Sequence, residues 1–574
     1  MKVHNAEIAE KFNELADLLE IKNENPFRIR AYRNAARLIK SLSHEATDLI
    51  KKEEDLTKFP GIGEDLAEKI IIIVKTGELP LLKQTRKKVP KALSDMMRIP
   101  DLGPKRVKIL YDKLKIRNIS DLKKAIKQGK VAKLEGFGEK TQEKIEKALA
   151  KFKTGEKKRL KLVDASMLAD SLVKFLQKIP GVKEVIVAGS FRRCKQTVGD
   201  LDILVTKSKN SHMMQRLLKY DGIKSVVSQG ETRATVKLHS GLQVDIRVVP
   251  QESYGAALLY FTGSQAHNIE VRKLAQQKSL KINEYGVFKG EKCIAGKTEK
   301  EVYRCVNLSY IEPELREDRG EIAVSLKNKL PKLITLKDIK GDLHCHTNVS
   351  DGQNSIEEMV RAAQKLGYKY LAITEHSKHL TIANGLNEKQ LLQQIKKIDK
   401  LNPKLKNFQI LKSIECDILE DGKLDLSDDV LKELDFVIGA IHSKFKLSSA
   451  KQTERILRAM DNKYFNILAH PTGRLINQRD AYEIDLEKIM WEAKDRGCFM
   501  ELNAQPDRLD LDDVHCKMAK ESGVKISIAT DAHSAATLEY MHYGIDQARR
   551  GWLSARDVLN TRSWFELKKL FIRS

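Results

Sequence analysis

The amino-acid sequence predicts a multidomain protein in which an α-helical region, an α+β region and a β/α barrel with seven strand-like segments follow one another. Apolar residues recur at helical spacing in the first 150 residues, and strand-like runs replace them in the middle of the chain. After residue 337, seven short apolar runs alternate with helical patterns. A chain of 574 residues is also too long for one core, because domains average about 150 residues.

The composition favours a polyanionic partner. Lys and Arg number 104 against 79 Asp and Glu, a net charge of +25 that would help to hold nucleic acid. Many proteins are equally basic for solubility alone. No apolar stretch approaches the roughly 20 residues of a membrane span, and the start of the chain has no signal-like apolar region. Seven cysteines without a Cys-x-x-Cys pair indicate reduced thiols, so we expect a cytoplasmic protein without a membrane partner.

A glycine-bearing turn is repeated three times in the helical region. FPGIGEDLAEKI begins at residue 59, IPDLGPKRVKIL at 99 and LEGFGEKTQEKI at 134. Each turn directly precedes an amphipathic helix, so backbone N–H groups at the helix start can face a phosphate unobstructed by side chains. One such turn is usually only a connection, but three in a basic segment indicate phosphate binding. The glycines concerned are Gly61, Gly63, Gly103, Gly136 and Gly138.

These turns resemble helix-hairpin-helix motifs, which hold the DNA backbone without sequence preference. The middle copy departs from the pattern, because Asp101 stands where the other copies have glycine. Lys69, on the helix after the first hairpin, and Tyr32, in AYRNAA, match positions in the amino-terminal lyase domain of family X DNA polymerases. The resemblance implies that Lys69 could attack an abasic sugar as a Schiff-base nucleophile. An ordinary solvated or phosphate-facing lysine is the alternative.

Two aspartates alternate with apolar residues in GDLDILV, residues 199–205. The strand period of two places Asp200 and Asp202 on one face, while Leu201 turns into the core. We expect Asp245, in LQVDIRV, on a neighbouring strand. Three converging carboxylates suit Mg²⁺, which can activate a hydroxyl and neutralise phosphates. A lone Asp-x-Asp is usually a solvated strand edge, so this interpretation depends on the motifs around it.

Those motifs complete a resemblance to the palm and fingers of a family X DNA polymerase. GSFRRC (189–194) could hold a triphosphate, and YFTGSQAHNIEVR (260–272) lies downstream. The resemblance implies that the three aspartates are catalytic and bind Mg²⁺ or Mn²⁺, with Asp245 activating the primer 3′ hydroxyl. Cys194 stands where glycine is frequent, and Gln243 where some relatives have arginine. The implied nucleotide contacts are Ser190, Arg193, Gly199, Tyr260, Phe261, Gly263, Asn268 and Arg272.

Metal-binding residue types end all seven apolar runs of the last region: KGDLHCH, YLAITEH, ILKSIECD, DFVIGAIH, FNILAHP, CFMELN and KISIATDAH. A closed barrel would gather the carboxyl ends of these strands around one mouth. A mixed imidazole and carboxylate set suits Zn²⁺, Mn²⁺ or Fe²⁺ better than Mg²⁺, and it could hydrolyse a phosphate ester. The histidines 379, 515 and 542 lack the strand-end context. The candidate ligands are His344, His346, Asp351, His376, Glu415, His442, His470, Asp531 and His533.

This region, about residues 338–574, resembles the PHP (polymerase and histidinol phosphatase) domain, a distorted seven-stranded barrel that carries up to three metals. The resemblance implies one position from His344, His346, Glu415 and Asp531, a second from Asp351, His376 and His533, and a third from Glu415, His442 and His470.

The whole chain resembles a bacterial-type family X DNA polymerase fused to a PHP nuclease. That resemblance implies a monomer that fills short gaps in base excision repair, using gapped or nicked DNA and deoxynucleoside triphosphates, and that trims 3′ ends as a 3′-5′ exonuclease. Action at abasic sites stays open. Three alternatives remain: a phosphatase of small monoesters, a DNA-end tether with weak metal sites, and a template-independent nucleotidyltransferase, which would not need three hairpins.

The expected domains follow the same division. They are a helical lyase-like DNA-binding domain (1–80), a fingers-like helical region with two further hairpins (81–155), a nucleotidyltransferase palm with a nucleotide-binding subdomain (156–315), a linker (316–337) and the PHP phosphoesterase domain (338–574).

Overall fold

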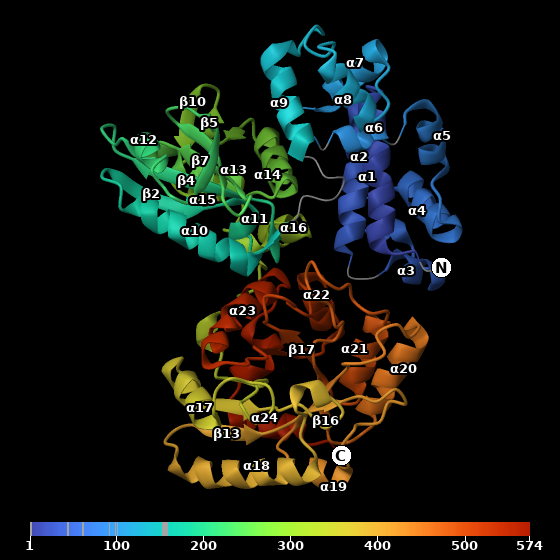
Figure 1. Cartoon of the computed structure of the whole chain (residues 1–574), viewed down its shortest axis with the longest axis vertical. Helices are drawn as coiled ribbons and strands as arrows, with labels where there is room; N and C mark the ends of the chain where they lie inside the picture. The colour runs from blue at the N-terminus through green and yellow to red at the C-terminus, as the bar shows by residue number, and fades with distance from the viewer. Residues whose placement is uncertain are drawn as a thin grey trace. The chain divides into compact units, whose positions relative to one another are not determined.

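The computed structural model describes residues 3–42, 45–59, 62–90, 92–97, 99, 102–151 and 159–573, and the chain forms two compact units, 1–157 and 158–574 (Figure 1). Among these described residues, no helix has the combined length and apolarity that crossing a bilayer requires. Gly61 and Asp101 of the predicted hairpins lie outside the described residues.

The first unit is helical, as the spacing of its apolar residues predicts. The longest helices, α1 and α2, pack side by side (Figure 1), and the Phe12 ring stacks on Tyr32 with centroids 5.9 Å apart. Ile8, Phe12 and Leu15 are fully buried because their spacing puts them on one helix face. The helices are α1 (Asn5–Ile21), α2 (Pro26–Ser41), α3 (Ala46–Lys51), η1 (Leu56–Lys58), α4 (Glu64–Thr76), α5 (Pro80–Lys88), α6 (Ala92–Met96), α7 (Pro104–Leu114), α8 (Ile119–Lys127) and α9 (Gly138–Lys151).

A five-stranded sheet opens the second unit. Its order is β2 (Val182–Val187), β4 (Asp200–Lys207), β7 (Gln243–Val248), β6 (Arg233–Leu238) and β5 (Ile223–Gln229). The pair β4 and β7 is parallel and the other pairs are antiparallel. Alternate residues of β4, such as Leu201 and Ile203, are fully buried, which leaves the aspartates between them on the opposite face. Around the sheet lie β1 (Leu160–Lys161), α10 (Leu162–Gln177), α11 (Gly189–Arg192), β3 (Thr197–Val198) and α12 (Met213–Leu217).

A smaller α+β part follows, and it extends through the segment that the sequence suggests is a linker. Arg316, Glu321 and Ser325 are fully buried, so the first half of the segment 316–337 is packed, whereas residues 326–329 and 335–337 are exposed. Its elements are η2 (Gln251–Ser253), α13 (Tyr254–Thr262), α14 (Gln265–Gln277), β8 (Lys281–Asn283), β9 (Gly286–Lys289), β10 (Lys292–Ala295), α15 (Glu299–Cys305), η3 (Pro313–Leu315) and α16 (Glu321–Leu326).

The last part alternates parallel strands with helices. One sheet contains β11 (Gly341–Asp342), β12 (Tyr370–Ile373) and β13 (Gln409–Lys412); the other contains β14 (Glu415–Asp417), β15 (Val437–Ala440), β16 (Phe465–Leu468), β17 (Phe499–Asn503) and β18 (Ile526–Ala529). Only Ser413 and Ile414 separate β13 from β14, and a parallel bridge pairs Cys345 with Ala532. These links join the two sheets edge to edge, as the predicted distorted barrel requires.

The helices of this part connect the strands (Figure 1). They are η4 (Leu336–Asp338), α17 (Ile356–Lys365), η5 (Thr381–Ala383), α18 (Glu388–Leu401), η6 (Asn402–Lys404), α19 (Asp428–Leu431), α20 (Ser449–Met460), α21 (Leu486–Asp495), α22 (Asp513–Ser522), η7 (Ala535–Tyr540), α23 (Met541–Arg550), η8 (Ala555–Asp557), η9 (Leu559–Thr561) and α24 (Trp564–Phe571).

Candidate active sites and DNA-binding turns

Three aspartates meet on two parallel strands of the five-stranded sheet. Asp202 of β4 pairs in register with Asp245 of β7, and Asp200 lies two residues earlier on the same face of β4. Asp200 is exposed, whereas Asp245 is only 9% exposed. Burial, together with the charges of Asp200 and Asp245, raises the pKa of Asp202 to about 6. The crowded carboxylates therefore form a site that a divalent cation would stabilise.

Both oxygens of Asp245 are held by neighbours. The Thr235 hydroxyl donates to Oδ1 at 2.6 Å, and the Gln243 side-chain amide donates to Oδ2 at 2.8 Å. Thr235 is also the register partner of Asp245 on β6. Thr235 is not among the residues predicted from the sequence, although its alternation with buried neighbours places it on the aspartate face. Gln243, predicted only as a departure from the family pattern, thus orients the third aspartate.

The GSFRRC turn begins beside these aspartates. Gly189 has a φ of +64°, and a Cβ there would lie 2.4 Å from Asp202 Oδ2, so only glycine fits. Ser190 follows it in the short helix α11. Arg193 is held away from solvent, since its Nε lies 3.0 Å from Glu317 and its guanidinium also contacts the Thr262 carbonyl. The turn that carries Ser190 and Arg193 therefore begins beside the aspartates.

The other predicted nucleotide contacts gather at the junction of α13 and α14. Gly263, with a φ of +68°, ends α13 directly after Tyr260, Phe261 and Thr262. The Asn268 amide donates to the Tyr260 carbonyl at 2.8 Å, and the Arg272 guanidinium lies 5.6 Å from the Tyr260 ring centre. Gly199 stands apart from this group, and a Cβ there would meet Arg159 Nη1 at 3.0 Å.

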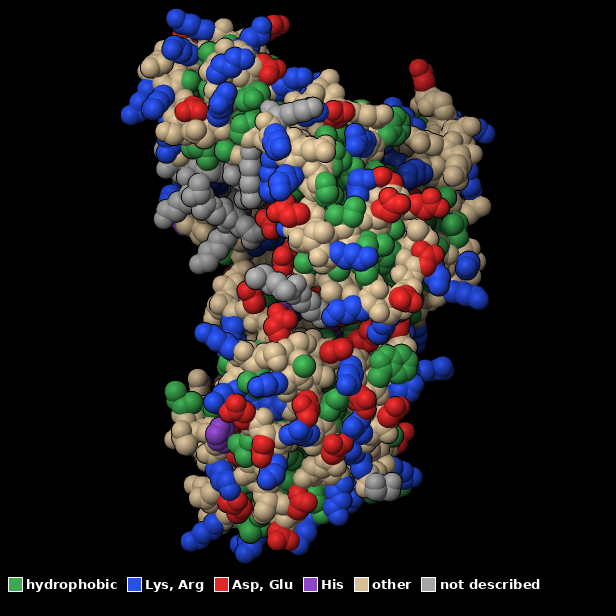
Figure 2. Space-filling model, turned by 90° about the vertical axis from the view of Figure 1, so that its right-hand side faces the viewer, with side chains coloured by type: hydrophobic (Ala, Val, Ile, Leu, Met, Phe, Trp, Pro, Cys, Tyr) green, Lys and Arg blue, Asp and Glu red, His purple; other side chains and the backbone are tan. Residues whose placement is uncertain are grey.

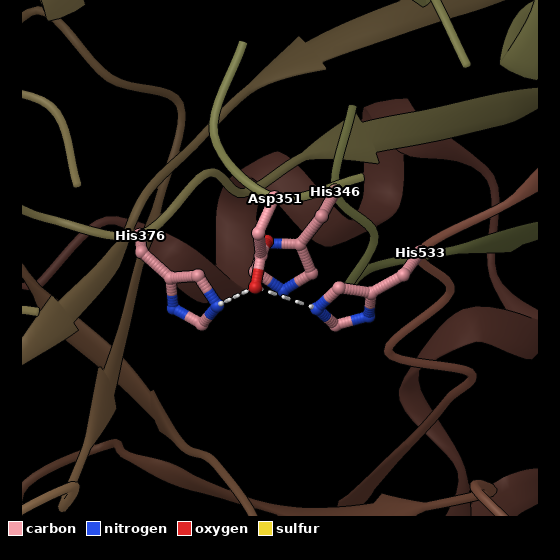
Figure 3. Close-up of side chains that lie close together, drawn as sticks. All are labelled: His346, Asp351, His376 and His533. Atoms are coloured by element: carbon pink, nitrogen blue, oxygen red, sulfur yellow. Dashed lines mark ion pairs between the residues drawn. The ribbon is translucent and has the colours of Figure 1, made fainter. Parts of the chain in front are cut away.

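All nine predicted ligands of the barrel region come together at the strand ends. In Figure 3, His346, His376 and His533 point toward the Asp351 carboxylate, and Nε2 of both His376 and His533 lies 3.4 Å from Oδ2. The ligand atoms of these four residues all lie within 4.8 Å of one another. They come from three separate segments, since His346 and Asp351 both follow β11 while His376 follows β12 and His533 follows β18, and the barrel brings these segments to one mouth.

Two further groups adjoin this one. The first contains His344, His346 and Asp531, and the second contains His376, Glu415 and His442. His470 also joins, because its Nε2 lies 2.9 Å from Glu415 Oε1. The grouping differs from the family division in that His346 and His376 each lie in two groups. Which ion each side chain holds stays a prediction.

The cluster is built for cations. Within the described part of the chain, Glu415 Oε2 and His376 Nδ1 are buried without a hydrogen-bond partner, although they lie only 2.7 Å apart. Burial opposes the charge of Glu415, yet the surrounding histidines hold its pKa well below the usual range. Burial likewise opposes protonation of His376, but Glu415 and Asp351 raise its pKa to about 10. In the absence of a metal ion, protons on the histidines balance the charges of these carboxylates. A bound metal would replace those protons.

Two further carboxylates, not predicted from the sequence, contact the predicted ligands. Glu501 Oε1 lies 2.6 Å from His344 Nδ1, and its Oε2 accepts from the His470 backbone N–H at 2.7 Å. Asp417 Oδ1 lies 3.2 Å from His442 Nδ1. Both carboxylates stand in the recognised apolar runs CFMELN and ILKSIECD. Such partners fix the ring orientation and tautomer of metal-binding histidines.

The histidines set aside from the sequence have other neighbours. His379 is partly exposed, with Nε2 3.5 Å from Asp417 Oδ2, so it lies close to the cluster. His515 lies 2.9 Å from Asp512, and His542 Nδ1 lies 2.6 Å from the Glu539 carbonyl.

The described hairpin glycines leave open space before their helices. Gly63 and Gly103 directly precede α4 and α7, and Gly136 and Gly138 have φ values of +81° and +65°. A Cβ at any of the four would meet nothing within 4 Å. Residues 102–151 contain 15 Lys and Arg against six Asp and Glu. Lys and Arg side chains, blue in Figure 2, are numerous on the face that it shows.

The predicted lyase residues lie in the same unit. Lys69 forms an ion pair with Asp65 one helical turn earlier, and its side chain is 17% exposed. Tyr32 is 2% exposed in the core. A paired ammonium is not a nucleophile, so the Lys69–Asp65 pair would have to break before any attack.

Comparison with known proteins gives matches along the whole chain. Family models match as a helix-hairpin-helix domain (3–79), a SAM-like helix-hairpin-helix tandem (93–151), a DNA polymerase beta palm (163–260), a DNA polymerase beta thumb (257–317) and a PHP domain (342–505). Tyr260 lies where the matches to the palm and thumb models overlap.

Individual relatives agree with this division. The DNA polymerase/3′-5′ exonuclease PolX of Bacillus subtilis is 38% identical over 576 residues and covers all of both chains. A probable phosphatase of Thermoanaerobacter sp. is 31% identical over 232 residues, which is 38% of this chain and 89% of that protein. A probable phosphatase of Caldicellulosiruptor bescii is 30% identical over 207 residues, 34% of this chain and 81% of that protein. The chain therefore belongs to the PolX family, the family X DNA polymerases that carry a PHP domain.

Proposed function

We propose that this protein fills short gaps in DNA by template-directed synthesis and trims 3′ ends with the 3′-5′ exonuclease activity of its PHP domain. One observation carries the proposal: Asp202 and Asp245 face each other in register, with Asp200 beside them, in a chain that also holds the nine-ligand cluster. A carboxylate site suits Mg²⁺ or Mn²⁺ and nucleotidyl transfer, whereas the imidazole-rich site suits Mn²⁺, Zn²⁺ or Fe²⁺ and hydrolysis.

At the polymerase site, Asp200, Asp202 and Asp245 would hold the ions. When bound, the ions would lower the pKa of the primer 3′ hydroxyl and neutralise the triphosphate. Asp245, oriented by Thr235 and Gln243, would take part in activating that hydroxyl. Ser190, Arg193 and Gly199 would hold the triphosphate, Tyr260, Phe261 and Gly263 would contact the sugar, and Asn268 and Arg272 would face the base pair and template.

At the PHP site, the histidines and carboxylates of the cluster would hold up to three ions. Bound ions would neutralise the scissile phosphodiester during hydrolysis. Glu501 would keep His344 in the tautomer whose Nε2 faces the cluster, because the Glu501 carboxylate would accept a hydrogen bond of 2.6 Å from Nδ1–H.

Gapped or nicked DNA would be held through the glycine turns, whose open helix starts suit backbone phosphates. Deoxynucleoside triphosphates would be the second substrate. The lyase role of Lys69, action at abasic sites, the monomeric state and the cytoplasmic location stay predictions, and so do the expected domain boundaries.

The test uses a 5′-labelled primer in a one-nucleotide gap with Mn²⁺, with and without deoxynucleotides. Asp200→Ala/Asp202→Ala should still shorten the primer but not lengthen it. His344→Ala/His346→Ala should do the reverse. Asp221→Ala and His542→Ala are matched controls on exposed residues and should retain both activities. Wild-type protein that neither lengthens nor shortens the primer would overturn the proposal.

A second candidate is hydrolysis of small phosphate monoesters, which the likeness to probable phosphatases favours. p-Nitrophenyl phosphate hydrolysis that is lost in His344→Ala/His346→Ala, with no shortening of DNA by wild type, would support this candidate.

A further inference from the structure

Three side chains from separate segments meet outside both sites described above. They are Cys194, directly after α11, Glu314 in η3 and Asp546 in α23. The thiol sulfur and one carboxylate oxygen from each acid lie within 4.8 Å of one another. Cys194 and Asp546 are half-buried and Glu314 is 9% exposed, so the cluster is enclosed but can still be reached by an ion.

Glu314 is only half satisfied. Its Oε1 accepts from Arg549 Nε at 2.7 Å, while its Oε2 is buried and has no hydrogen-bond partner among the residues that the structure describes. An unpartnered buried carboxylate oxygen costs free energy, and native proteins rarely leave one. The Glu314 carboxylate, next to the Cys194 thiol, therefore has one oxygen that is free to bind a cation.

The charges of the cluster also favour a bound cation. Burial first, then the charges of Asp546 and Glu314, raise the pKa of the Cys194 thiol well above its ordinary value. Burial and the charge of Glu314 raise the pKa of Asp546 to about 7. One arginine, Arg549, pairs directly with the cluster. A divalent cation together with Arg549 would balance a thiolate and two carboxylates.

The backbone at Cys194 adds to this. Its φ of +52° lies in the left-handed region, where a residue with a Cβ is strained by about 1 kcal/mol or more and glycine is not. Glycine would adopt this conformation without strain but has no side chain, whereas Cys194 places a thiol at this position.

We propose that Cys194, Glu314 and Asp546 bind one Zn²⁺ ion, distinct from the metals of the polymerase and PHP sites. A thiolate with two carboxylates suits Zn²⁺, and water would complete a four-coordinate site. Tetrahedral Zn²⁺ needs ligand atoms roughly 3.5 Å apart, so the side chains would close slightly around the ion. Because its ligands come from three segments, the ion would link the GSFRRC turn, which carries Arg193, with η3 and with α23 of the barrel region.

The test is Co²⁺ binding to the metal-free, full-length protein, followed by absorption spectroscopy. Co²⁺ also enters carboxylate and histidine sites, but only a thiolate ligand gives a sulfur-to-cobalt charge-transfer band in the near ultraviolet. We expect one such band in wild type, its loss in Cys194→Ser, a weaker affinity in Asp546→Asn, and displacement by one equivalent of Zn²⁺ beyond those that fill the other sites. Cys293→Ser, at an exposed cysteine of β10, is the matched control and should keep the band.

A wild-type protein without the band, or a band that survives in Cys194→Ser, would overturn the proposal. The Asp546→Asn variant keeps the test decisive if Cys194→Ser fails to fold, because an unchanged Co²⁺ affinity there would also contradict it. Failure here leaves the polymerase and nuclease assignments intact, since those are read from primer length.

Discussion

Arg550 of the barrel region donates a hydrogen bond from Nη1 to the backbone carbonyl of Arg193, 2.6 Å away in the GSFRRC turn. Arg550 also lies 3.1 Å from Glu317 and 2.6 Å from Asp513, and it is 3% exposed. Glu317 in turn contacts Arg193 and Lys195. A buried cation from the PHP region therefore supports the turn that would bind the triphosphate.

Replacing Arg550 with lysine should weaken nucleotide use. Lysine keeps the charge but cannot contact Arg193, Glu317 and Asp513 together, since it lacks the planar fork. Loss of one such charged hydrogen bond predicts a rise of about tenfold in KM for deoxynucleotides. Exonuclease rates should stay unchanged. The control variant Arg556→Lys, at an exposed residue, should keep both the polymerase and the exonuclease activity. Equal losses of both activities would instead indicate general destabilisation.

Thr235→Val should impair the polymerase specifically. The substitution keeps the shape of the side chain but removes the hydroxyl that holds Asp245 Oδ1 at 2.6 Å. Loss of a partner that orients a metal ligand typically lowers activity or metal affinity by about 10- to 100-fold. Single-nucleotide gap filling at increasing Mg²⁺ would measure both. Primer shortening in the same samples is the internal control.

Glu501→Gln should have the mirror effect on the nuclease. An amide can still meet His344 Nδ1, but it no longer favours the tautomer that presents Nε2 to the cluster. We expect a loss of about 10- to 100-fold in primer shortening, partly restored by more Mn²⁺, with gap filling unaffected. Glu433→Gln, at an exposed glutamate of the same region, is the control. A normal nuclease in Glu501→Gln would show that the contact does not orient the ligand.

The buried ion pairs of Glu299 with Arg192 and Arg316 should make the free energy of unfolding depend on pH. Burial opposes the charge of Glu299, but Arg316 and Arg192 lower its pKa from 4.5 to about 2. A depressed carboxyl pKa stabilises the fold above the unfolded pKa of about 4.5, and this contribution is lost as pH falls from there through about 2. The shift corresponds to about 3 kcal/mol at neutral pH.

Unfolding of Glu299→Gln and wild type between pH 2 and pH 7 checks this relationship. The difference in free energy of unfolding should be largest at pH 7 and shrink toward pH 2. Glu291→Gln, at an exposed glutamate, should follow wild type throughout. A difference that is independent of pH would rule out the charge of Glu299 as its cause.

Valine at Gly63 or Gly103 should weaken DNA binding without unfolding the helical unit. Both glycines have ordinary φ values of −88° and −77°, and a Cβ there meets nothing within 4 Å. The added side chain would cover N–H groups at the helix start, and loss of one hydrogen bond to phosphate predicts about tenfold weaker binding. Fluorescence anisotropy with gapped DNA, beside melting curves, separates obstruction from unfolding.

The sequence predicts the placement of the acidic and imidazole groups well. The strand period of two and the apolar neighbours of Asp200 and Asp202 already imply one face, and the short distance to another strand implies Asp245. Eight of the nine PHP residues are predicted because they end apolar runs, and parallel strands must end together in a barrel, whereas Asp351 lies five residues after His346. Their roles as ligands stay predictions.

Through-space partners could not be predicted in the same way. Thr235 and Glu501 act by facing a ligand across the sheet or barrel, and the strand alternation or apolar run that contains each of them also contains residues without such a role. The segment 316–337 resembled a solvated linker because it is rich in charge. Arg316 and Glu321 are nevertheless buried, since Arg316 pairs with Glu299 and Glu321 with His267. Composition cannot distinguish a paired buried charge from a hydrated one.

The helix α23 contributes Asp546, Arg549 and Arg550 to contacts with the polymerase part. A gene shortened to encode only residues 1–337 would remove all three, so Glu314 would lose Arg549 and Glu317 would lose Arg550. Deletion would therefore damage the polymerase as well as remove the nuclease, and only point substitutions can separate the two activities genetically. Exchange of PHP domains between relatives would succeed only where this helix was exchanged together with its acidic partners.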